Sequence, residues 1–277
     1  MNLVDNHSHS NFSVDSRMDI DDAVRTAKAK GLGGIVFSDH LDFDPPEGVK
    51  IFTFDVPTQQ KTLEEHCQYL GVSTTGCPRE DAFMVMKGVE IGLQMKSMGK
   101  IRDVMKNNSF DSVIASQHLI DDCDPYYGGY YDTLDYKTAY GHYLEEFYKG
   151  IVEFGDFDIL GHYDYVVRYA DYPQVMMSYS EFGDVIDMIL KYLVEHGKTF
   201  EINTKTYQLY GKRHPELDIN ILKRFKELGG EALSFGSDAH DTFRIAEKFD
   251  WCRECALKAG IEYEVFFSGR KPHFVKL

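Results

Sequence analysis

The chain has 277 residues, of which 43% are apolar and 14% aromatic, and its 30 basic and 45 acidic residues give a formal net charge of −15. This composition suits a large buried core. No stretch approaches the roughly 18 apolar residues of a membrane span, and the N-terminus lacks the pattern of a secretory signal. The acidic balance disfavours a general nucleic-acid binder. We therefore expect a soluble cytoplasmic protein without a nucleic-acid or membrane partner.

Short apolar, β-branched runs alternate with helical patterns from end to end, without a linker or repeat. The length suits two small domains or one α/β barrel, and the unbroken alternation favours a single domain over residues 1–277. It also predicts a parallel sheet, either closed as a barrel or open and doubly wound. The predicted strands are Leu3–Asn6, Gly34–Ser38, Met84–Glu90, Asp111–Ser116, Phe157–Gly161, Lys198–Asn203 and Ala232–Ser237.

Three helices are predicted from an apolar stripe on one face combined with start and stop residues. One helix follows Asp19, the second has a Ser cap and the third has a proline at its first helical position, and each stop is a glycine. The apolar stripes are interpreted as core. These helices lie between Asp19 and Gly31, between Ser180 and Gly197, and between Pro215 and Gly229.

Residues 121–135 follow neither the helical nor the strand period and are rich in tyrosine and glycine. We predict a long loop there. Two interpretations stay open, an ordinary surface connection or a lid beside an active site.

The cysteines are odd in number and widely scattered, which fits reduced thiols better than a disulfide framework. The pair Cys252-x-x-Cys255 lies in a helical pattern with no second pair or histidine nearby. Buried cysteines on a helix face are therefore favoured over a zinc knuckle. The five cysteines are Cys67, Cys77, Cys123, Cys252 and Cys255.

The eleven histidines fall into two groups once the strands are marked. One group lies in helices, helix ends or the tail, where a partly exposed histidine needs no special explanation: His66, His142, His196, His214 and His273. The other group lies at or just beyond the carboxyl end of a predicted strand: His7, His9, His40, His118, His162 and His240. The position of these six histidines at strand ends indicates a functional site.

In α/β barrels the loops that follow the strands converge on one face, so residues distant in sequence meet there. His7-x-His9 directs two imidazoles to the same side of an extended segment, and Glu90 and Asp238 add carboxylates at other strand ends. Such groups, buried together, would lack partners unless cations bound them. The set exceeds the roughly three protein ligands of a catalytic zinc, so we predict two or three divalent ions of zinc, manganese or iron.

These residues resemble the polymerase and histidinol phosphatase (PHP) superfamily, whose motifs occur here in order over nearly the whole chain. The matching segments are His7-Ser8-His9, Asp39-His40, Gly88-Val89-Glu90, His118, Gly161-His162-Tyr163-Asp164 and Asp238-Ala239-His240. Three further segments resemble the histidinol-phosphatase branch: Ser116-Gln117-His118, Glu201-Ile202-Asn203-Thr204 and, less distinctively, Arg270-Lys271-Pro272.

The resemblance implies a distorted, TIM-like (β/α)7 barrel with a trinuclear metal site. One ion would bind His7, His9, Glu90 and Asp238. A second would share Glu90 and add His118 and His162. The third would bind His40, His240 and the residue at position 15, which is Asp15 here and histidine in many relatives. A carboxylate still coordinates such ions.

The implied reaction is hydrolysis of L-histidinol phosphate to L-histidinol and phosphate, a step of histidine biosynthesis. Asp238 would orient the attacking water or accept its proton. Arg17 and Arg168 would bind phosphate oxygens and Asn203 the substrate, although a solvated surface charge is an equal alternative for each arginine.

Several other functions stay open. A PHP-type nuclease or phosphodiesterase would use the same metals, but the net charge of −15 argues against it. An amidohydrolase also begins with His-x-His, yet its pattern fits Asp39-His40 and Asp238-x-His240 poorly. Another small-molecule phosphatase and a non-catalytic metal-binding module are further alternatives.

Overall fold

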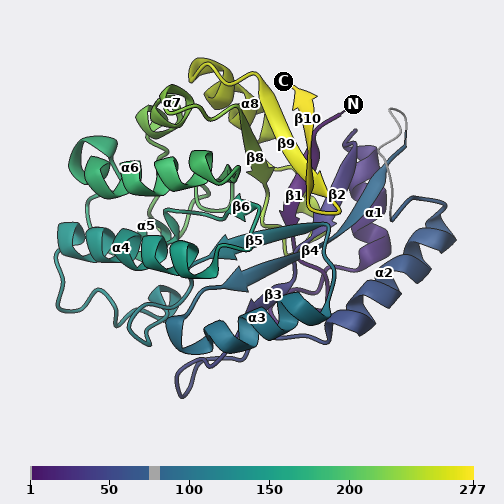
Figure 1. Ribbon diagram of the computed structural model, residues 1–277, viewed down its shortest axis with the longest axis horizontal. Coiled ribbons are helices and arrows are strands. Elements are labelled where there is room, and N and C mark those ends of the chain that lie inside the picture. Colours follow the sequence, from purple (N-terminus) through teal and green to yellow (C-terminus); the bar gives the residue numbers. More distant parts are fainter. Residues whose placement is uncertain (1, 75–81) are drawn as a thin grey trace.

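A curved parallel sheet forms the centre of the computed structural model, which describes residues 2–74 and 82–277 (Figure 1). Most strand residues are buried on both faces because helices cover the outside of the sheet. The parallel strands, in sheet order, are β1 (Val4–Ser8), β2 (Gly34–Phe37), β4 (Met84–Gly92), β5 (Ser112–Ser116), β6 (Ile159–Leu160), β7 (Thr199–Asn203) and β8 (Ala232–Gly236). Each predicted strand is present, with only its ends shifted. The short β3 (His40–Asp42) extends the sheet beyond β2 by pairing with β4.

The sheet closes on itself between β1 and β8, at their carboxyl ends. There the His9 amide donates to the Ala239 carbonyl at 2.9 Å, and the Asp238 amide donates to the His7 carbonyl at 2.7 Å. These bonds form the seam of a barrel, and they lie directly beside predicted site residues. The predicted distorted (β/α)7 barrel is confirmed.

A hairpin that the sequence analysis does not predict fills the amino end of the barrel. It consists of β9 (Tyr263–Ser268), which runs parallel to β8, and β10 (Lys271–Lys276). Its turn uses left-handed backbone at Gly269 and Arg270, with φ of 55° and 61°, as two-residue hairpin turns require. The β9 side chains Val265, Phe266 and Phe267 enter two buried clusters with the barrel strands.

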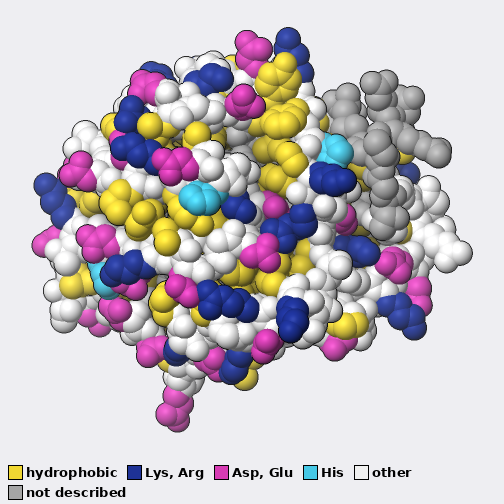
Figure 2. All heavy atoms as spheres, viewed as in Figure 1, with side chains coloured by type: hydrophobic (Ala, Val, Ile, Leu, Met, Phe, Trp, Pro, Cys, Tyr) yellow, Lys and Arg dark blue, Asp and Glu magenta, His cyan; other side chains and the backbone are white. Residues whose placement is uncertain are grey.

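The helices surround the barrel (Figure 1). They are α1 (Ile20–Ala29), α2 (Val56–Leu70), α3 (Met98–Asn107), α4 (Tyr136–Phe154), α5 (Tyr165–Tyr169), α6 (Tyr179–Glu195), α7 (Ile219–Glu227) and α8 (Phe249–Lys258), with short 3-10 turns η1 (Met95–Ser97), η2 (Pro125–Tyr127) and η3 (Thr242–Arg244). Within the described ranges, no helix is long and apolar enough to cross a membrane. Basic and acidic side chains are interspersed over the face shown in Figure 2, and apolar side chains follow the β9–β10 hairpin.

Two predicted helix starts are wrong. The N-cap of α6 is Ser178 rather than Ser180. Pro215 precedes α7, which begins after Asp218. The Asp218 carboxylate accepts hydrogen bonds from the amides of Asn220 (2.9 Å) and Tyr179 (2.8 Å), so one carboxylate caps α7 and also binds the first residue of α6. The helix predicted after Asp19 is confirmed as α1, and the Asp19 side chain caps it by accepting from the amides of Asp21 and Asp22.

The cysteine pair lies where the helical pattern predicts. Cys252 and Cys255 are buried on α8 and belong to the main hydrophobic core. Neither belongs to a group of side chains able to hold a metal ion among the described residues. Cys77 lies outside the described residues.

A buried carboxylate, Glu264 of β9, gives the fold a pH dependence that can be tested. Glu264 is fully buried and accepts hydrogen bonds from the Val4 amide at 3.1 Å and the Asn6 side chain at 3.2 Å. Burial raises its pKa well above the ordinary value of 4.5. The folded state therefore binds this proton more tightly, and its contribution to stability is lost as the pH rises from 4.5 through the folded pKa.

We expect Glu264→Gln to flatten the decline of the melting temperature between pH 5 and pH 8, because the amide has no proton to lose. Thermal unfolding across this pH range measures the effect. Glu262→Gln is the matched control, since Glu262 is exposed on the same segment. Parallel curves for wild type and Glu264→Gln would contradict the assignment.

Candidate metal centre

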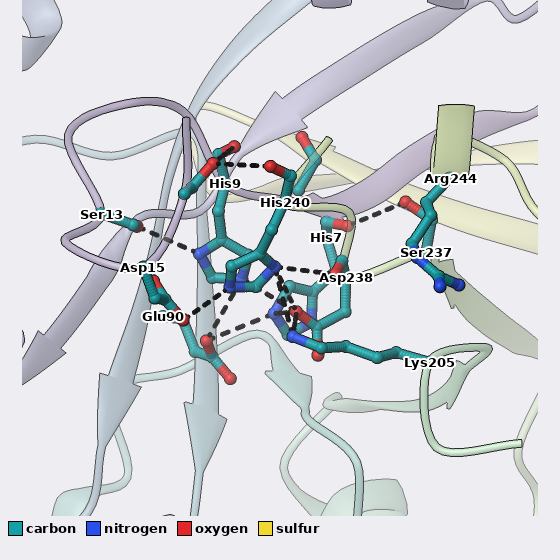
Figure 3. A network of polar contacts seen from close by, with 12 residues as sticks. His7, His9, Ser13, Asp15, Glu90, Lys205, Ser237, Asp238, His240 and Arg244 are labelled. Carbon is teal, nitrogen blue, oxygen red and sulfur yellow. Dashed lines mark hydrogen bonds and ion pairs between the residues drawn. The ribbon is translucent and has the colours of Figure 1, made fainter. Parts of the chain in front are cut away.

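The predicted donors converge at the carboxyl end of the barrel, and Figure 3 shows six of them: His7, His9, Asp15, Glu90, Asp238 and His240. Each comes from a strand end or from the loop that follows it, although they span more than 230 positions of the sequence. They are His7 on β1, His9 and Asp15 after it, His40 on β3, Glu90 on β4, His118 after β5, His162 after β6, and Asp238 and His240 after β8. The structure therefore brings together all nine residues that the sequence analysis singled out as ligands.

Glu90 lies at the centre of this cluster. Its carboxylate is fully buried, and its oxygens lie between 2.8 and 3.6 Å from a ring nitrogen of each of His7, His9, His40, His118 and His162. A charge this deep is stable only when positive groups or strong donors surround it.

Asp238 forms a second carboxylate position, beside the barrel seam. Its Oδ1 lies 3.2 Å from His9 Nε2, 3.5 Å from His240 Nδ1 and 3.0 Å from Lys205 Nζ. Asp238 has a left-handed backbone, with φ of 50°, a strained conformation that clusters at functional sites. This conformation lies two residues after the end of β8.

Asp15 lies on the outer side of the cluster. Its Oδ2 is 2.9 Å from His240 Nε2 and 3.7 Å from His40 Nε2. A third of its side chain is exposed (33%), so this part of the cluster faces the cavity. His9 lies next to the same pair, with its ring 4.1 Å from that of His40 and 4.3 Å from that of His240, measured between centroids.

Buried polar atoms that form no hydrogen bond, although several face one another at ion-pair distance, show that these residues fit metal ions. Five such atoms belong to the cluster: His7 Nε2, His9 Nε2, His40 Nδ1, His162 Nδ1 and Glu90 Oε2. Leaving them unsatisfied is costly, and a cation would complete them. Nitrogen and oxygen donors of this kind suit zinc, manganese or iron. Triads close enough to share an ion are His9–His40–His240, His7–His162–Asp238, His7–His9–Glu90 and His40–Glu90–His118.

Carboxylates and a hydroxyl behind the cluster orient its imidazoles. His7 Nδ1 lies 2.7 Å from Glu201 Oε1, and His118 Nδ1 lies 2.9 Å from Asp42 Oδ1. In each ring the proton on Nδ1 is held by the carboxylate, which leaves Nε2 facing the cluster, as metal-binding histidines require. His9 Nδ1 makes the equivalent contact with the Ser13 hydroxyl, at 3.2 Å.

Glycines make room for these supporting carboxylates. A Cβ at Gly236 would lie 2.1 Å from Glu201 Oε1, and one at Gly92 would lie 1.7 Å from Asp42 Oδ1. The sequence analysis missed both supporting carboxylates. Their positions in the sequence could have revealed them, because each lies at or near the carboxyl end of a strand that carries a predicted site residue. Glu201 is two residues before Asn203, and Asp42 is two residues after His40.

The charges in the cluster balance one another. Burial lowers the pKa of His7, but Glu201 and Glu90 outweigh burial and raise it well above its ordinary value. Burial and two neighbouring imidazoles lower the pKa of His9. Burial would raise the pKa of Glu90, yet the surrounding imidazoles hold it well below its usual range. Protons and metal ions therefore compete for the same positions.

A cavity of about 320 Å³ opens above the cluster, a size suited to a small molecule. Its floor includes Asp15, His40, His118, His162, Asp238 and His240, and its walls include Val49, Lys50, Phe52, Asp124, Tyr126, Tyr127, Tyr165 and Tyr169. The predicted loop 121–135 thus supplies part of the wall. Hydrogen bonds from the hydroxyls of Tyr130 and Tyr131 to the carbonyls of Ala139 and Val166, both 2.7 Å, anchor it.

The three predicted substrate contacts do not line this cavity. Arg17 is exposed on the surface. The Arg168 guanidinium contacts backbone carbonyls after β7, including that of Gln208 at 3.4 Å, so it holds a loop. Asn203 donates to Asp238 Oδ2 at 3.3 Å and accepts from the Lys205 amide at 3.0 Å, so it supports a turn.

Two lysines line the cavity, Lys50 and Lys205, and the one beside the cluster is Lys205, which the sequence analysis missed. Its ammonium lies 3.0 Å from Asp238 Oδ1. Its place two residues after β7 was the signal in the sequence.

The geometry is that of a PHP-type metal centre at the end of a (β/α)7 barrel. The PHP domain family matches residues 5–205, and the chain belongs to this family.

The relatives that align with nearly the whole chain belong to the histidinol-phosphatase branch of the PHP family. The chain is 31% identical to a Clostridium acetobutylicum protein named "Probable histidinol-phosphatase", over 97% of this chain and 98% of the relative. It is 30% identical to the histidinol-phosphatase of Lactococcus lactis, over 98% and 96%. A crystal structure of the Lactococcus lactis histidinol phosphate phosphatase with zinc, L-histidinol and phosphate matches with a TM-score of 0.85 and 29% identity, covering 98% of this chain and 99% of that one.

The contact between the Glu201 carboxylate and His7 Nδ1 leads to a testable prediction about metal binding. Replacing Glu201 with Gln keeps a hydrogen-bond acceptor for His7 Nδ1 but removes the charge that strengthens the imidazole as a ligand. We expect metal affinity to fall by about 10- to 100-fold, measured as zinc retention in competition with a chelator. Glu231→Gln is the control, since Glu231 is exposed at the start of β8. Equal retention in both variants would refute the role of Glu201.

Proposed function

We propose that this chain is a cytoplasmic, metal-dependent phosphomonoesterase that hydrolyses L-histidinol phosphate to L-histidinol and phosphate in histidine biosynthesis, with residues 1–277 forming one domain. The observation that carries the proposal is a metal-binding cluster open to a small cavity in a chain that aligns end to end with histidinol-phosphatases. The relative with zinc, L-histidinol and phosphate bound supports the same substrate.

Two or three divalent ions are proposed as cofactors, with zinc first and manganese or iron as alternatives. The proposed sets are His7, His9, Glu90 and Asp238 for one ion, Glu90, His118 and His162 for the second, and Asp15, His40 and His240 for the third. Short distances within each set support this division, for example 2.8 Å between Glu90 and His162 and 2.9 Å between Asp15 and His240. His9 lies between the first and third sets.

Bound ions would supply Lewis-acid stabilisation of the phosphoryl group and an activated water. Asp238 is the residue that we propose to orient this water or accept its proton. Burial would raise the pKa of Asp238, but Lys205 and His7 hold it well below its usual range, so the group is an ionised carboxylate that can accept a hydrogen bond from the water. The Lys205 ammonium, held against Asp238, would bind a phosphate oxygen. The contacts of Arg17 and Arg168 with phosphate oxygens stay predictions beside it.

The size of the cavity favours a small phosphomonoester over a nucleic-acid strand. At about 320 Å³ it accommodates one small organic group beside the metal centre. A phosphodiesterase acting on nucleic acid needs a groove that follows a charged backbone.

Loss of cluster residues should remove metal and activity together. Wild-type protein purified without chelators should carry more than one ion per chain by elemental analysis. His9→Ala and Glu90→Ala should carry fewer ions and lose more than about 1000-fold in turnover of histidinol phosphate. His66→Ala is the control, because His66 pairs with Asp21 on the helical side of the barrel. Full activity in either cluster variant would refute the site.

A comparison of kcat/KM among several phosphate esters tests the proposed substrate. We expect kcat/KM for histidinol phosphate to exceed that for phenyl phosphate and for bis(p-nitrophenyl) phosphate by at least about 100-fold, measured as release of phosphate or of nitrophenol. Preference for the diester would instead indicate a phosphodiesterase.

A further inference from the structure

One carboxylate on the cavity wall, Asp124, differs in its surroundings from the other carboxylates that line the cavity. Asp15 and Asp42 contact imidazoles of the cluster, and Asp238 pairs with Lys205. Within the described parts of the chain, Asp124 forms no ion pair with any basic side chain. Its charge is therefore available to a group inside the cavity.

The surroundings of Asp124 leave one of its oxygens free. Oδ1 accepts hydrogen bonds from the Tyr126 amide at 2.8 Å and from the Tyr165 hydroxyl at 3.3 Å. Oδ2 has no hydrogen-bond partner among residues 2–74 and 82–277. Burial raises the pKa of this carboxyl, which shows that its ionised form lacks full compensation. A cation placed beside Oδ2 would supply it.

Tyr165 connects Asp124 with the metal centre. Its ring lies 5.3 Å from that of His118 and 5.2 Å from that of His162, measured between centroids, and its hydroxyl reaches Asp124. The carboxylate is thus separated from the metal centre by about one aromatic side chain. A ligand with its phosphate at the metals would extend toward Asp124 with its alcohol portion.

Aromatic rings continue the wall beside the carboxylate. The ring of Tyr126 meets that of Tyr169 at 5.3 Å, and Tyr169 meets Tyr165 at 4.9 Å. Aromatic faces bind flat rings and cations. A carboxylate next to them selects an organic group that combines a ring with positive charge.

We propose that Asp124, together with Tyr126, Tyr165 and Tyr169, forms the subsite that selects a cationic, ring-bearing alcohol portion of the substrate. The proposal rests on the phosphomonoesterase function proposed above and deepens it. L-Histidinol fits this chemistry because it carries an ammonium group and an imidazole. The subsite binds the leaving alcohol, while the metal centre and Lys205 bind the phosphoryl group.

The test compares two esters in two matched variants. Asp124→Asn removes the charge but keeps an oxygen able to cap η2 through the Tyr126 amide. The readout is the ratio of kcat/KM for histidinol phosphate to kcat/KM for phenyl phosphate, which has a ring but no cationic group. We expect this ratio to fall on the order of 10- to 100-fold, mainly through KM for histidinol phosphate.

Asp132→Asn is the control, since Asp132 is exposed on the same loop and loses the same charge. Its ratio should stay within about twofold of wild type. An unchanged ratio in Asp124→Asn, or an equal loss for both esters, would overturn the subsite. A wild-type enzyme that cleaves phenyl phosphate as well as histidinol phosphate would overturn the proposed function, and the subsite with it.

Discussion

The arrangement of strand ends in this protein follows from the need to satisfy one buried carboxylate. Glu90 is fully buried at the carboxyl end of β4, and removing such a charge from water costs several kcal/mol unless close partners replace the solvent. Five imidazoles from four other segments supply them. A sheet that curves until its strand ends face one another is the geometry that lets distant segments contribute to one such set.

The imidazoles around Glu90 also need hydrogen-bond partners on their far side. An imidazole that turns one nitrogen to the centre must bind its other nitrogen elsewhere, and Glu201 and Asp42 do this for His7 and His118. These carboxylates in turn require space that a side chain at Gly236 or Gly92 would fill. The site is therefore built into the barrel strands, and the loops add the cavity wall.

Sequence patterns predict the parallel strands and the cluster because both depend on position along a strand. The ends of apolar runs are visible in the sequence, and barrel geometry brings those ends together. The direction of a long side chain is not encoded in this way. Arg168 turns toward the carbonyls of the segment after β7, and no local pattern distinguishes this from pointing into the cavity. The hairpin β9–β10 was missed although a signal was present, since Gly269 and Arg270 separate two short runs of strand-type residues.

The barrel seam makes the last barrel strand a condition for completing the first and third proposed metal sites. β1 and β8 are joined by the backbone bonds of His7 and His9 with Asp238 and Ala239, and the first proposed ion would bridge the same two segments through side chains. During synthesis the N-terminal histidines emerge first, and their carboxylate partner emerges only after some 230 further residues. A chain that stops before β8 lacks both the strand that closes the barrel and the donors at 238 and 240, so the first and third proposed sites can be completed only after β8 has been synthesised.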